Sequence, residues 1–324
     1  MDTYQATTEY LLKLPVFDCW HEMESILRRS AATRPRDWEL PLIICEALGE
    51  AREKAIPACA ALACAQISII LVDDMLDEDP RGGYHRIGSG RVANFALAFQ
   101  AAGVEALLRS GARSQVSFEA VKSLSQMMST TALGQDLDIQ NPADEKSYWQ
   151  VVKNKSAPFY GCALHLGALF GEAIQATASG LKRLGELYGE MIQIHDDLND
   201  TMAVPANSDW LQGRKPLPIL FAQSVKHPQR ARFMELYKNI SAENALQEAQ
   251  EILIRCGAIS YCVDQLLRSH EAAQAILDEV PLHNKAAVDS VIAAIIAPVQ
   301  KLFNMLGVSP QAITTMAKEA HLEG

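Results

Sequence analysis

Positive charge is scarce in this sequence of 324 residues. Its 29 Lys and Arg residues are outnumbered by 39 Asp and Glu residues, so the formal net charge is -10 at pH 7. A partner with a phosphate backbone requires a basic surface, and this composition therefore argues against nucleic acid binding. Aromatic residues are also few, at 6%. Ala, Leu and Ile dominate the apolar stretches instead, which favours helices over strands.

Several patterns that mark other classes of protein are missing. The seven cysteines form no CxxC pair and stand mostly among Ala and Ile, so we expect free thiols in a reducing cytoplasm. The first residues, MDTYQATTEYLLKLP, lack a basic segment followed by an apolar one, and we predict no signal peptide. No low-complexity tract or Pro/Ser-rich linker divides the chain. We therefore expect a single domain over residues 1–324.

One uncharged stretch, residues 55–72 (AIPACAALACAQISIILV), is long enough to raise the question of a membrane span. It contains Pro57, Gln66 and Ser68, is rich in Ala rather than Leu, and ends at two aspartates. These features predict a helix buried at the centre of a large helical protein, and no transmembrane segment.

The chain has long apolar-faced segments separated by clusters of Pro and Gly, and no convincing alternating pattern of a strand. The predicted helices are 5–30, 41–50, 55–79, 90–110, 115–137, 145–175, 178–203, 215–238, 242–279 with a break near Gly257, and 284–320. This organisation predicts an all-α helical bundle.

Two clusters of aspartates share one spacing, i, i+1 and i+4, and each follows an apolar helical stretch. The clusters are VDDMLD and HDDLND, and their aspartates are Asp73, Asp74, Asp77, Asp196, Asp197 and Asp200. Like charges on one helix face repel each other, and a divalent cation such as Mg²⁺ compensates that repulsion. One such cluster alone is typical of a solvated helix end. The second copy favours a site in which Mg²⁺ ions between the clusters hold a diphosphate.

Other polar residues accompany the clusters. Gln135 and Asp138 lie in LGQDLDIQ, and Lys155 is followed by Ser156 in KNKSAPFYG. A basic Gly- or Pro-containing loop follows each acid cluster, the first with Arg81 and the second with Arg214 and Lys215. Taken alone, Gln135, Asp138 and Lys155 are more typical of a helix surface than of a site.

In order, DDMLD, GQDLD, KS, IQIHDDLND and QGRKPLPIL resemble the motifs of the trans-isoprenyl diphosphate synthases, the polyprenyl synthetase family, over about residues 40–225. The resemblance implies a single-domain antiparallel bundle of the isoprenoid synthase type around a deep apolar cavity. It also implies a cytoplasmic homodimer in isoprenoid biosynthesis that uses several Mg²⁺ ions, with Mn²⁺ as an alternative, and an allylic prenyl diphosphate as substrate.

The resemblance also assigns roles by position. The metal ligands would be Asp73, Asp74, Asp77, Asp196, Asp197 and Asp200, and with Lys155 the first five of these would be the catalytic residues. The substrate-binding residues would be Arg81, Gln135, Asp138, Gln193, Arg214, Lys215, Ser68 and Ile69. In this family, bulky aromatic residues four or five positions before the first Asp shorten the tunnel for the hydrocarbon tail. Ser68 and Ile69 occupy those positions, which predicts a deep tunnel for a geranylgeranyl or longer chain.

The sequence departs from the family at the site for a second substrate, isopentenyl diphosphate. Chain-elongating members bind it through an early GKRxRP, a His before the first acid motif and an Arg-Arg-Gly. Here the early stretch is TRPRDWELPL, the His position holds Gln66, and PRGG keeps one arginine. Other arginines that could substitute are Arg34, Arg36, Arg86 and Arg91.

Three functions remain open on this basis. The first is a prenyltransferase that joins the allylic group to an isoprenoid or other acceptor. The second is a class I terpene synthase that cyclises a C20 or longer prenyl diphosphate without isopentenyl diphosphate. The third is a non-catalytic subunit of a heteromeric prenyl synthase, and the two complete acid motifs argue against it.

Overall fold

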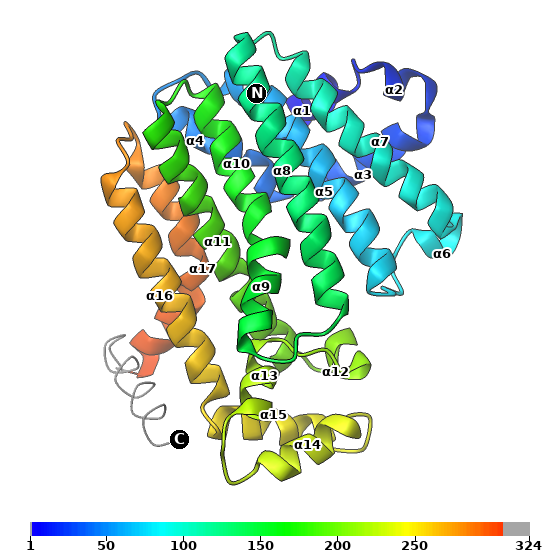
Figure 1. Ribbon diagram of the computed structural model, residues 1–324, viewed down its shortest axis with the longest axis vertical. Coiled ribbons are helices and arrows are strands. Elements are labelled where there is room, and N and C mark those ends of the chain that lie inside the picture. The colour runs from blue at the N-terminus through cyan, green and yellow to red at the C-terminus, as the bar shows by residue number, and fades with distance from the viewer. Residues whose placement is uncertain (1, 307–324) are drawn as a thin grey trace.

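The computed structural model describes residues 2–306, and every regular element within them is a helix (Figure 1). The α-helices are α1 Thr3–Leu11, α2 Pro15–Cys19, α3 His21–Ala32, α4 Leu40–Ala47, α5 Ile56–Leu76, α6 Tyr84–Ile87, α7 Ser89–Leu108, α8 Ser114–Ile139, α9 Glu145–Lys155, α10 Ala157–Phe170, α11 Gln175–Met202, α12 Ser208–Gln212, α13 Leu217–Ser224, α14 Arg230–Lys238, α15 Ala245–Arg255, α16 Ala258–Glu279 and α17 Lys285–Leu306. Two short 3₁₀ helices, η1 Arg36–Glu39 and η2 Arg52–Ala55, lead into α4 and α5. The predicted all-α class is confirmed.

Three of the predicted helices are more divided than expected. Residues 5–30 form α1, α2 and α3, with Pro15 at the start of α2. The predicted helix 145–175 breaks at Ser156, because Pro158 has no backbone N–H to continue α9 and fits the first turn of α10 instead. Residues 215–238 divide into α13 and α14. The break near Gly257 is confirmed, with φ +85 at that glycine, and the part of 284–320 beyond residue 306 lies outside the described residues.

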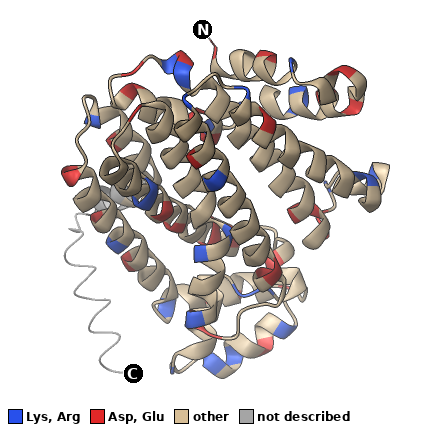
Figure 2. Cartoon of the chain, turned by 45° about the horizontal axis from the view of Figure 1, so that its top comes forward, with Lys and Arg blue, Asp and Glu red and all other residues tan. Residues whose placement is uncertain are grey.

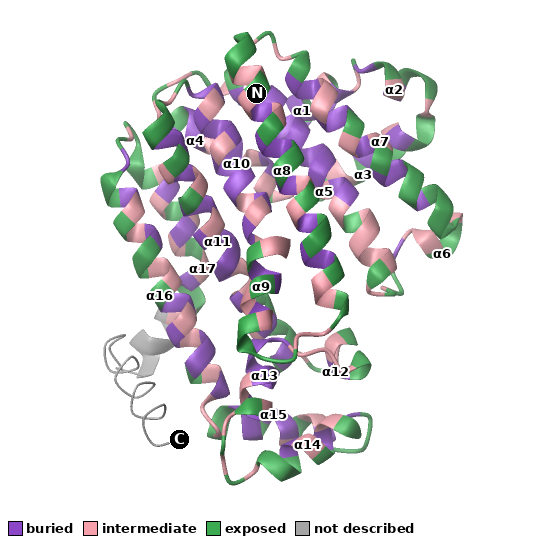
Figure 3. Cartoon of the chain, in the orientation of Figure 1, coloured by how far each residue is buried: buried purple, intermediate pink, exposed green. Residues whose placement is uncertain are grey.

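Helices α5, α10 and α11 lie at the centre of the bundle, and the other long helices surround them (Figure 1). Helix α10 packs along α11, α5 along α7, and α16 covers another side of α11. Figure 3 shows buried residues concentrated along these helices. Helices α12 to α15 have a separate apolar cluster around Trp210 and Phe233 at the lower end of Figure 1.

The long apolar stretch is the buried core of α5. The helical segment of residues 52–76 is long and apolar enough to cross a membrane, but 67% of its most apolar 18 residues are buried inside the protein. Every residue from Ile56 to Ala65 is buried against neighbouring helices. This burial agrees with the predicted central helix. In the view of Figure 2, acidic and basic positions are interspersed over the surrounding helices and loops.

Gly134, the glycine of LGQDLD, fixes the approach of α8 to the end of α9. A Cβ atom at this position would lie 2.2 Å from the backbone nitrogen of Lys155. Any larger residue would therefore separate the two helices. This close approach brings Gln135 and Asp138 of α8 next to Lys155.

Candidate functional site

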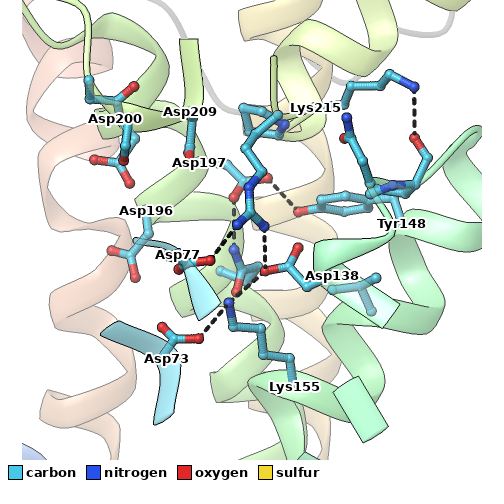
Figure 4. Close-up of a pocket in the computed structure, with 18 of the residues that line it drawn as sticks. Asp73, Asp77, Asp138, Tyr148, Lys155, Asp196, Asp197, Asp200, Asp209 and Lys215 are labelled. Atoms are coloured by element: carbon cyan, nitrogen blue, oxygen red, sulfur yellow. Dashed lines mark hydrogen bonds and ion pairs between the residues drawn. The ribbon is translucent and has the colours of Figure 1, made fainter. Parts of the chain in front are cut away.

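The two acid clusters lie at the carboxyl ends of α5 and α11 and open onto one cavity of about 670 Å³ (Figure 4). Asp73 lies in the last turn of α5 and Asp77 caps it, while Asp196 and Asp200 lie in the last turns of α11. The carboxyl end of a helix carries partial negative charge, so carboxylates there are doubly unfavourable unless cations accompany them. The site is therefore built to attract positive charge.

The cavity carries more negative than positive charge. Eight aspartates line it, against four basic residues. The aspartates are Asp73, Asp77, Asp79, Asp138, Asp196, Asp197, Asp200 and Asp209, and the basic residues are Arg81, Lys155, Arg214 and Lys215. An anionic substrate alone would be repelled by this excess, whereas a substrate that arrives with divalent cations would be attracted.

Lys155 connects the first acid cluster to the GQDLD motif. Its Nζ lies 2.6 Å from Oδ2 of Asp138 and 3.1 Å from Oδ1 of Asp73. Gln135 Nε2 donates to the same Asp73 oxygen at 3.3 Å. Burial alone would lower the pKa of Lys155, but Asp138 and Asp73 outweigh it and the pKa is raised. Lys155 is therefore held as a cation facing the cavity.

The loop after the second acid cluster reaches back to the first one. Arg214 Nη2 lies 2.5 Å from Oδ1 of Asp77, and Gln212 Nε2 donates to the Asp77 carbonyl at 2.9 Å. The other side of the loop is held by Asn141, which donates to the Gly213 carbonyl at 2.7 Å. Burial and the nearby Asp73 raise the pKa of Asp77. The loop thus forms part of the cavity wall and supplies a cation to it.

Asp197 differs from the other aspartates because the protein itself satisfies both of its oxygens. Oδ2 accepts from the Tyr148 hydroxyl and from the Leu217 backbone N–H, both at 2.8 Å, and Oδ1 accepts from Gln193 Nε2 at 2.8 Å. Burial raises the pKa of Asp197 to about 7. Asp197 is 5% exposed. This geometry suits a residue that positions α9, α11 and α13 around the site, rather than a direct metal ligand.

The remaining predicted residues occupy different places around the cavity. Gln193 lines it and accepts from Ser156 Oγ at 2.5 Å, which joins the KS motif to the second acid cluster. Lys215 Nζ donates to the Pro142 carbonyl at 3.4 Å. Arg81 is largely exposed and pairs with Asp79 at 2.8 Å, so it lies at the rim. Asp74 is not part of the lining.

Ser68 and Ile69 lie deeper in α5 and outside the lining of this polar cavity. Ser68 is completely buried, and its hydroxyl has no hydrogen-bond partner among the residues that the structure describes. Ile69 is partly buried against the main core. The apolar tunnel expected beside them remains a prediction.

The structure adds two lining residues that the sequence reasoning missed. Tyr148 hydrogen-bonds Asp197, and burial raises the pKa of Asp209 to about 6. Neither residue belongs to a motif with recognisable spacing. The one available signal for Asp209 was its position in the basic loop that follows HDDLND. Two histidines lie on or near these helices. Nδ1 of His195 lies 3.5 Å from Oδ1 of Asp196. Nδ1 of His165 is hydrogen-bonded to Ser123 Oγ at 2.9 Å, and His165 is not part of the cavity lining.

The donor set fits Mg²⁺. The cavity offers carboxylate oxygens, which are the ligands that this hard cation prefers. Within residues 2–306, no three acidic, Cys or His side chains form a complete ligand cluster. Magnesium commonly keeps waters and takes oxygens from a phosphorylated substrate, so one or two carboxylates per ion suffice.

Comparisons with known proteins identify the family. The family model described as polyprenyl synthetase matches residues 31–253. The geranylgeranyl pyrophosphate synthase of Geoglobus acetivorans is 26% identical over 265 residues, covering 76% of this chain and 81% of that protein. The geranylfarnesyl diphosphate synthase of Aeropyrum pernix is 25% identical over 250 residues, covering 72% and 78%.

Solved structures show the same fold. A decaprenyl diphosphate synthase from Rhodobacter capsulatus superimposes with a TM-score of 0.79 at 16% identity, covering 92% of this chain and 95% of that one. The family match, which spans most of the chain, agrees with the motif order and with the cavity that the motifs form. The chain therefore belongs to the polyprenyl synthetase family and is an isoprenoid diphosphate-using enzyme.

Proposed function

We propose that this chain ionises an allylic prenyl diphosphate with the help of Mg²⁺ and transfers the prenyl group to an acceptor. The observation that carries the proposal is the convergence of both acid clusters, Lys155 and Arg214 on one cavity. The relatives named as geranylgeranyl and geranylfarnesyl diphosphate synthases support a prenyl diphosphate as the substrate.

The carboxylates that open onto the cavity have two roles in this proposal. Asp73 and Asp77 would hold metal ions from the first cluster, and Asp196 and Asp200 from the second. Bound Mg²⁺ would supply Lewis acidity and neutralise the charge of a leaving diphosphate. Asp197 would keep the second cluster in place through its three hydrogen bonds.

The basic residues act on the leaving group. As the allylic C–O bond breaks, the electron pair leaves with the diphosphate, and Lys155, Arg214 and Lys215 would donate hydrogen bonds to its oxygens. Such donors stabilise developing charge strongly because they are already oriented and partly shielded from water. Lys155 and Arg214 meet this requirement, since their side chains are only 20% and 16% exposed.

A class I terpene synthase is the second candidate. The observation that favours it is Gln66, which stands where the family has a His and is held by two neighbours. Gln66 Nε2 donates to Asp37 Oδ2 at 2.7 Å, and Trp38 Nε1 donates to Gln66 Oε1 at 2.7 Å. A residue fixed in this way is not free to bind a second diphosphate. In a cyclase, the carbocation would instead react with its own double bonds.

The homodimer and the cytoplasmic location also belong to this proposal. Leu97 of α7, Leu108 at its end and Phe118 of α8 are each more than 60% exposed, at 63%, 62% and 62%. A contiguous exposed apolar surface is typical of a protein–protein contact, and α7 packs against α8, so we propose this face as the interface between two copies.

The test is an assay of diphosphate release. Purified protein is incubated with Mg²⁺ and geranyl, farnesyl or geranylgeranyl diphosphate, with and without isopentenyl diphosphate, and products are identified by mass spectrometry. We expect release that stops when EDTA removes the metal. A prenylated acceptor indicates the transferase, and a hydrocarbon or alcohol from one substrate indicates the cyclase. If no condition releases diphosphate, the proposal is wrong and the non-catalytic subunit is favoured.

Tail length provides a separate prediction. We expect Ser68→Phe to shift substrate or product preference toward shorter chains, because an aromatic ring at this buried position would obstruct the path predicted for the hydrocarbon tail. Overpacking of this kind typically costs about 1 to 3 kcal/mol of stability, so the thermal midpoint is measured as well. The matched control is Ile70→Phe on the same helix, where the side chain is 50% exposed. An unchanged chain-length profile in folded Ser68→Phe would contradict the tunnel prediction.

A further inference from the structure

A second cavity, with a volume of about 260 Å³, lies where α10 packs between α8 and α11 (Figure 1). We call it the α10 cavity, and its lining comes from these three helices and from the last turn of α9. It shares no lining residue with the cavity of the acid clusters. Helix α9 gives Lys153 to the α10 cavity and Lys155 to the other one. Two residues lie about 200° apart around a helix axis, so the two lysines point to opposite sides of α9.

The α10 cavity carries an excess of positive charge, although the chain as a whole is acidic. Its charged residues are Lys153, Lys182, Arg183, Glu186 and Glu190. Arg183 is already paired, because its Nη1 lies 3.2 Å from Oε2 of Glu186. Neither lysine forms an ion pair with a residue that the structure describes. Two ammonium groups without a carboxylate partner on one small cavity favour the binding of an anion.

Glu190 contributes a buried hydrogen-bond acceptor to the same cavity. It is 7% exposed, and its Oε1 has no hydrogen-bond partner among the described residues. Arg183 Nη1 lies 3.9 Å from this oxygen, which is too far for a hydrogen bond. Burial raises the pKa of Glu190, and the charges of Arg183 and Lys153 oppose that change. A buried acceptor without a donor is costly, so Glu190 favours a bound molecule that brings a donor to it.

The hydroxyl groups of the lining already have partners within the protein. Thr130 Oγ1 donates to the Gln126 carbonyl at 2.8 Å, and Ser123 Oγ is hydrogen-bonded to His165 Nδ1 at 2.9 Å. Apolar side chains, among them Met127, form another part of the wall. Pockets for drug-sized ligands have volumes of about 300 to 1,000 Å³, so this cavity suits a smaller molecule. Such a molecule would have a short carbon skeleton.

The α10 cavity lies on the side of α8 that is turned away from the homodimer interface proposed above. That interface uses Phe118 of α8, whereas Met127 of the same helix lines the cavity. Nine residues correspond to two and a half helical turns, so the two side chains point in opposite directions. The proposed dimer therefore leaves the cavity open to a ligand.

We propose that the α10 cavity binds a small organic phosphate that carries a hydroxyl group. Lys153 and Lys182 would bind the phosphate oxygens, Glu190 would accept the hydrogen bond of the hydroxyl, and Met127 and Pro158 would contact the carbon skeleton. A phosphate monoester carries a charge of about -1.5 to -2 at pH 7. Two ammonium groups match that charge better than the single charge of a carboxylate. The site is separate from the reaction proposed above and does not depend on it.

The test measures the binding of three matched molecules to the full chain by isothermal titration calorimetry, without Mg²⁺ and without a prenyl diphosphate. Glycerol 3-phosphate has both the phosphate and the hydroxyl, propyl phosphate has the same carbon skeleton without a hydroxyl, and glycerol has no phosphate. We expect glycerol 3-phosphate to bind with a Kd of about 1 mM or lower. Propyl phosphate should bind about tenfold more weakly because it leaves the Glu190 acceptor unpaired, and glycerol should not bind measurably.

Two variants test the residues that hold the phosphate and the hydroxyl. Lys182→Met should raise the Kd of glycerol 3-phosphate about tenfold or more, because a charge-assisted hydrogen bond is lost. Glu190→Met should remove the difference between glycerol 3-phosphate and propyl phosphate. The matched control is Lys122→Met, which loses the same charge from an exposed side chain that pairs with Glu119 at 3.4 Å and does not line the cavity. It should bind both phosphates as the original chain does.

Three results would overturn the inference. The first is no binding of glycerol 3-phosphate up to about 10 mM. The second is equal binding of glycerol 3-phosphate and propyl phosphate to the original chain, since the hydroxyl then adds nothing. The third is a Kd that rises in Lys155→Met and not in Lys182→Met, which would place the phosphate in the cavity of the acid clusters. None of these results bears on the proposed function, which is tested by diphosphate release.

Discussion

Asp73→Ala is expected to lower the rate of diphosphate release by about 1,000-fold or more, because metal-ion catalysis is worth several kcal/mol. Asp73 lines the cavity and is the carboxylate that Lys155 and Gln135 both contact. The alanine removes an expected metal donor and frees Lys155 from one of its two carboxylates. The measurement is diphosphate release over a range of Mg²⁺ concentrations, with the thermal midpoint recorded to confirm folding.

Asp136→Ala provides the matched control for this substitution. Asp136 lies in the same LGQDLD segment as Gln135 and Asp138 but is exposed, and its carboxylate accepts from Gln140 at the end of the same helix at 2.9 Å. We expect this variant to keep the original rate and Mg²⁺ dependence. A folded Asp73→Ala variant with the full rate would disprove the metal assignment of the first acid cluster.

Asp197→Ala is expected to reduce the free energy of unfolding by about 3 kcal/mol or more, because each buried donor left without a partner costs about 1 to 3 kcal/mol. The three donors are the Tyr148 hydroxyl, the Leu217 N–H and Gln193 Nε2. Urea unfolding of the metal-free protein measures the change. Asp200→Ala is the control, since Asp200 is exposed and belongs to the same motif. Equal stability of the two variants would contradict the positioning role of Asp197.

The pH dependence of Asp197 has a defined sign. Burial raises its pKa from 3.8 to about 7, so the folded state holds the proton more tightly than the unfolded state. Its contribution to stability is fully present below pH 3.8 and is lost as the pH rises through about 7. Asp197→Asn cannot titrate. The free energy of unfolding of this variant should therefore increase relative to that of the original chain as the pH rises from 5 to 8. A difference between the two proteins that does not change with pH would argue against the raised pKa.

The surroundings of Asp197 show why equal spacing does not imply equal environments. The sequence treats Asp74 and Asp197 alike, as the second aspartate of each cluster. In the structure, Asp74 lies outside the cavity lining, whereas Asp197 lines it with both oxygens already bonded. Two of its three partners, Tyr148 and Leu217, come from α9 and α13, and helical spacing within α11 contains no information about these two.

The sequence by itself determined the helical class, the central position of residues 55–72 and the two acid clusters. Periodicity and composition are local properties, and they fix which residues share a helix face. The order of the motifs matched that of the family, and this resemblance was the reason to expect the two acid clusters to face one site. Helix ends were less well determined. The apolar pattern of residues 145–175 is continuous, and it did not reveal the break at Ser156 and Pro158 between α9 and α10.

Only the tertiary structure decided how the charges are paired. Lys155 lies between Asp138 and Asp73, which are 17 and 82 residues away from it in the chain, and Arg214 meets Asp77 across 137 residues. Likewise, Asp37 and Gln66 meet across 29 residues. Contacts over such separations depend on how the helices pack, because the local pattern of a segment does not specify the side chains that another segment brings to it.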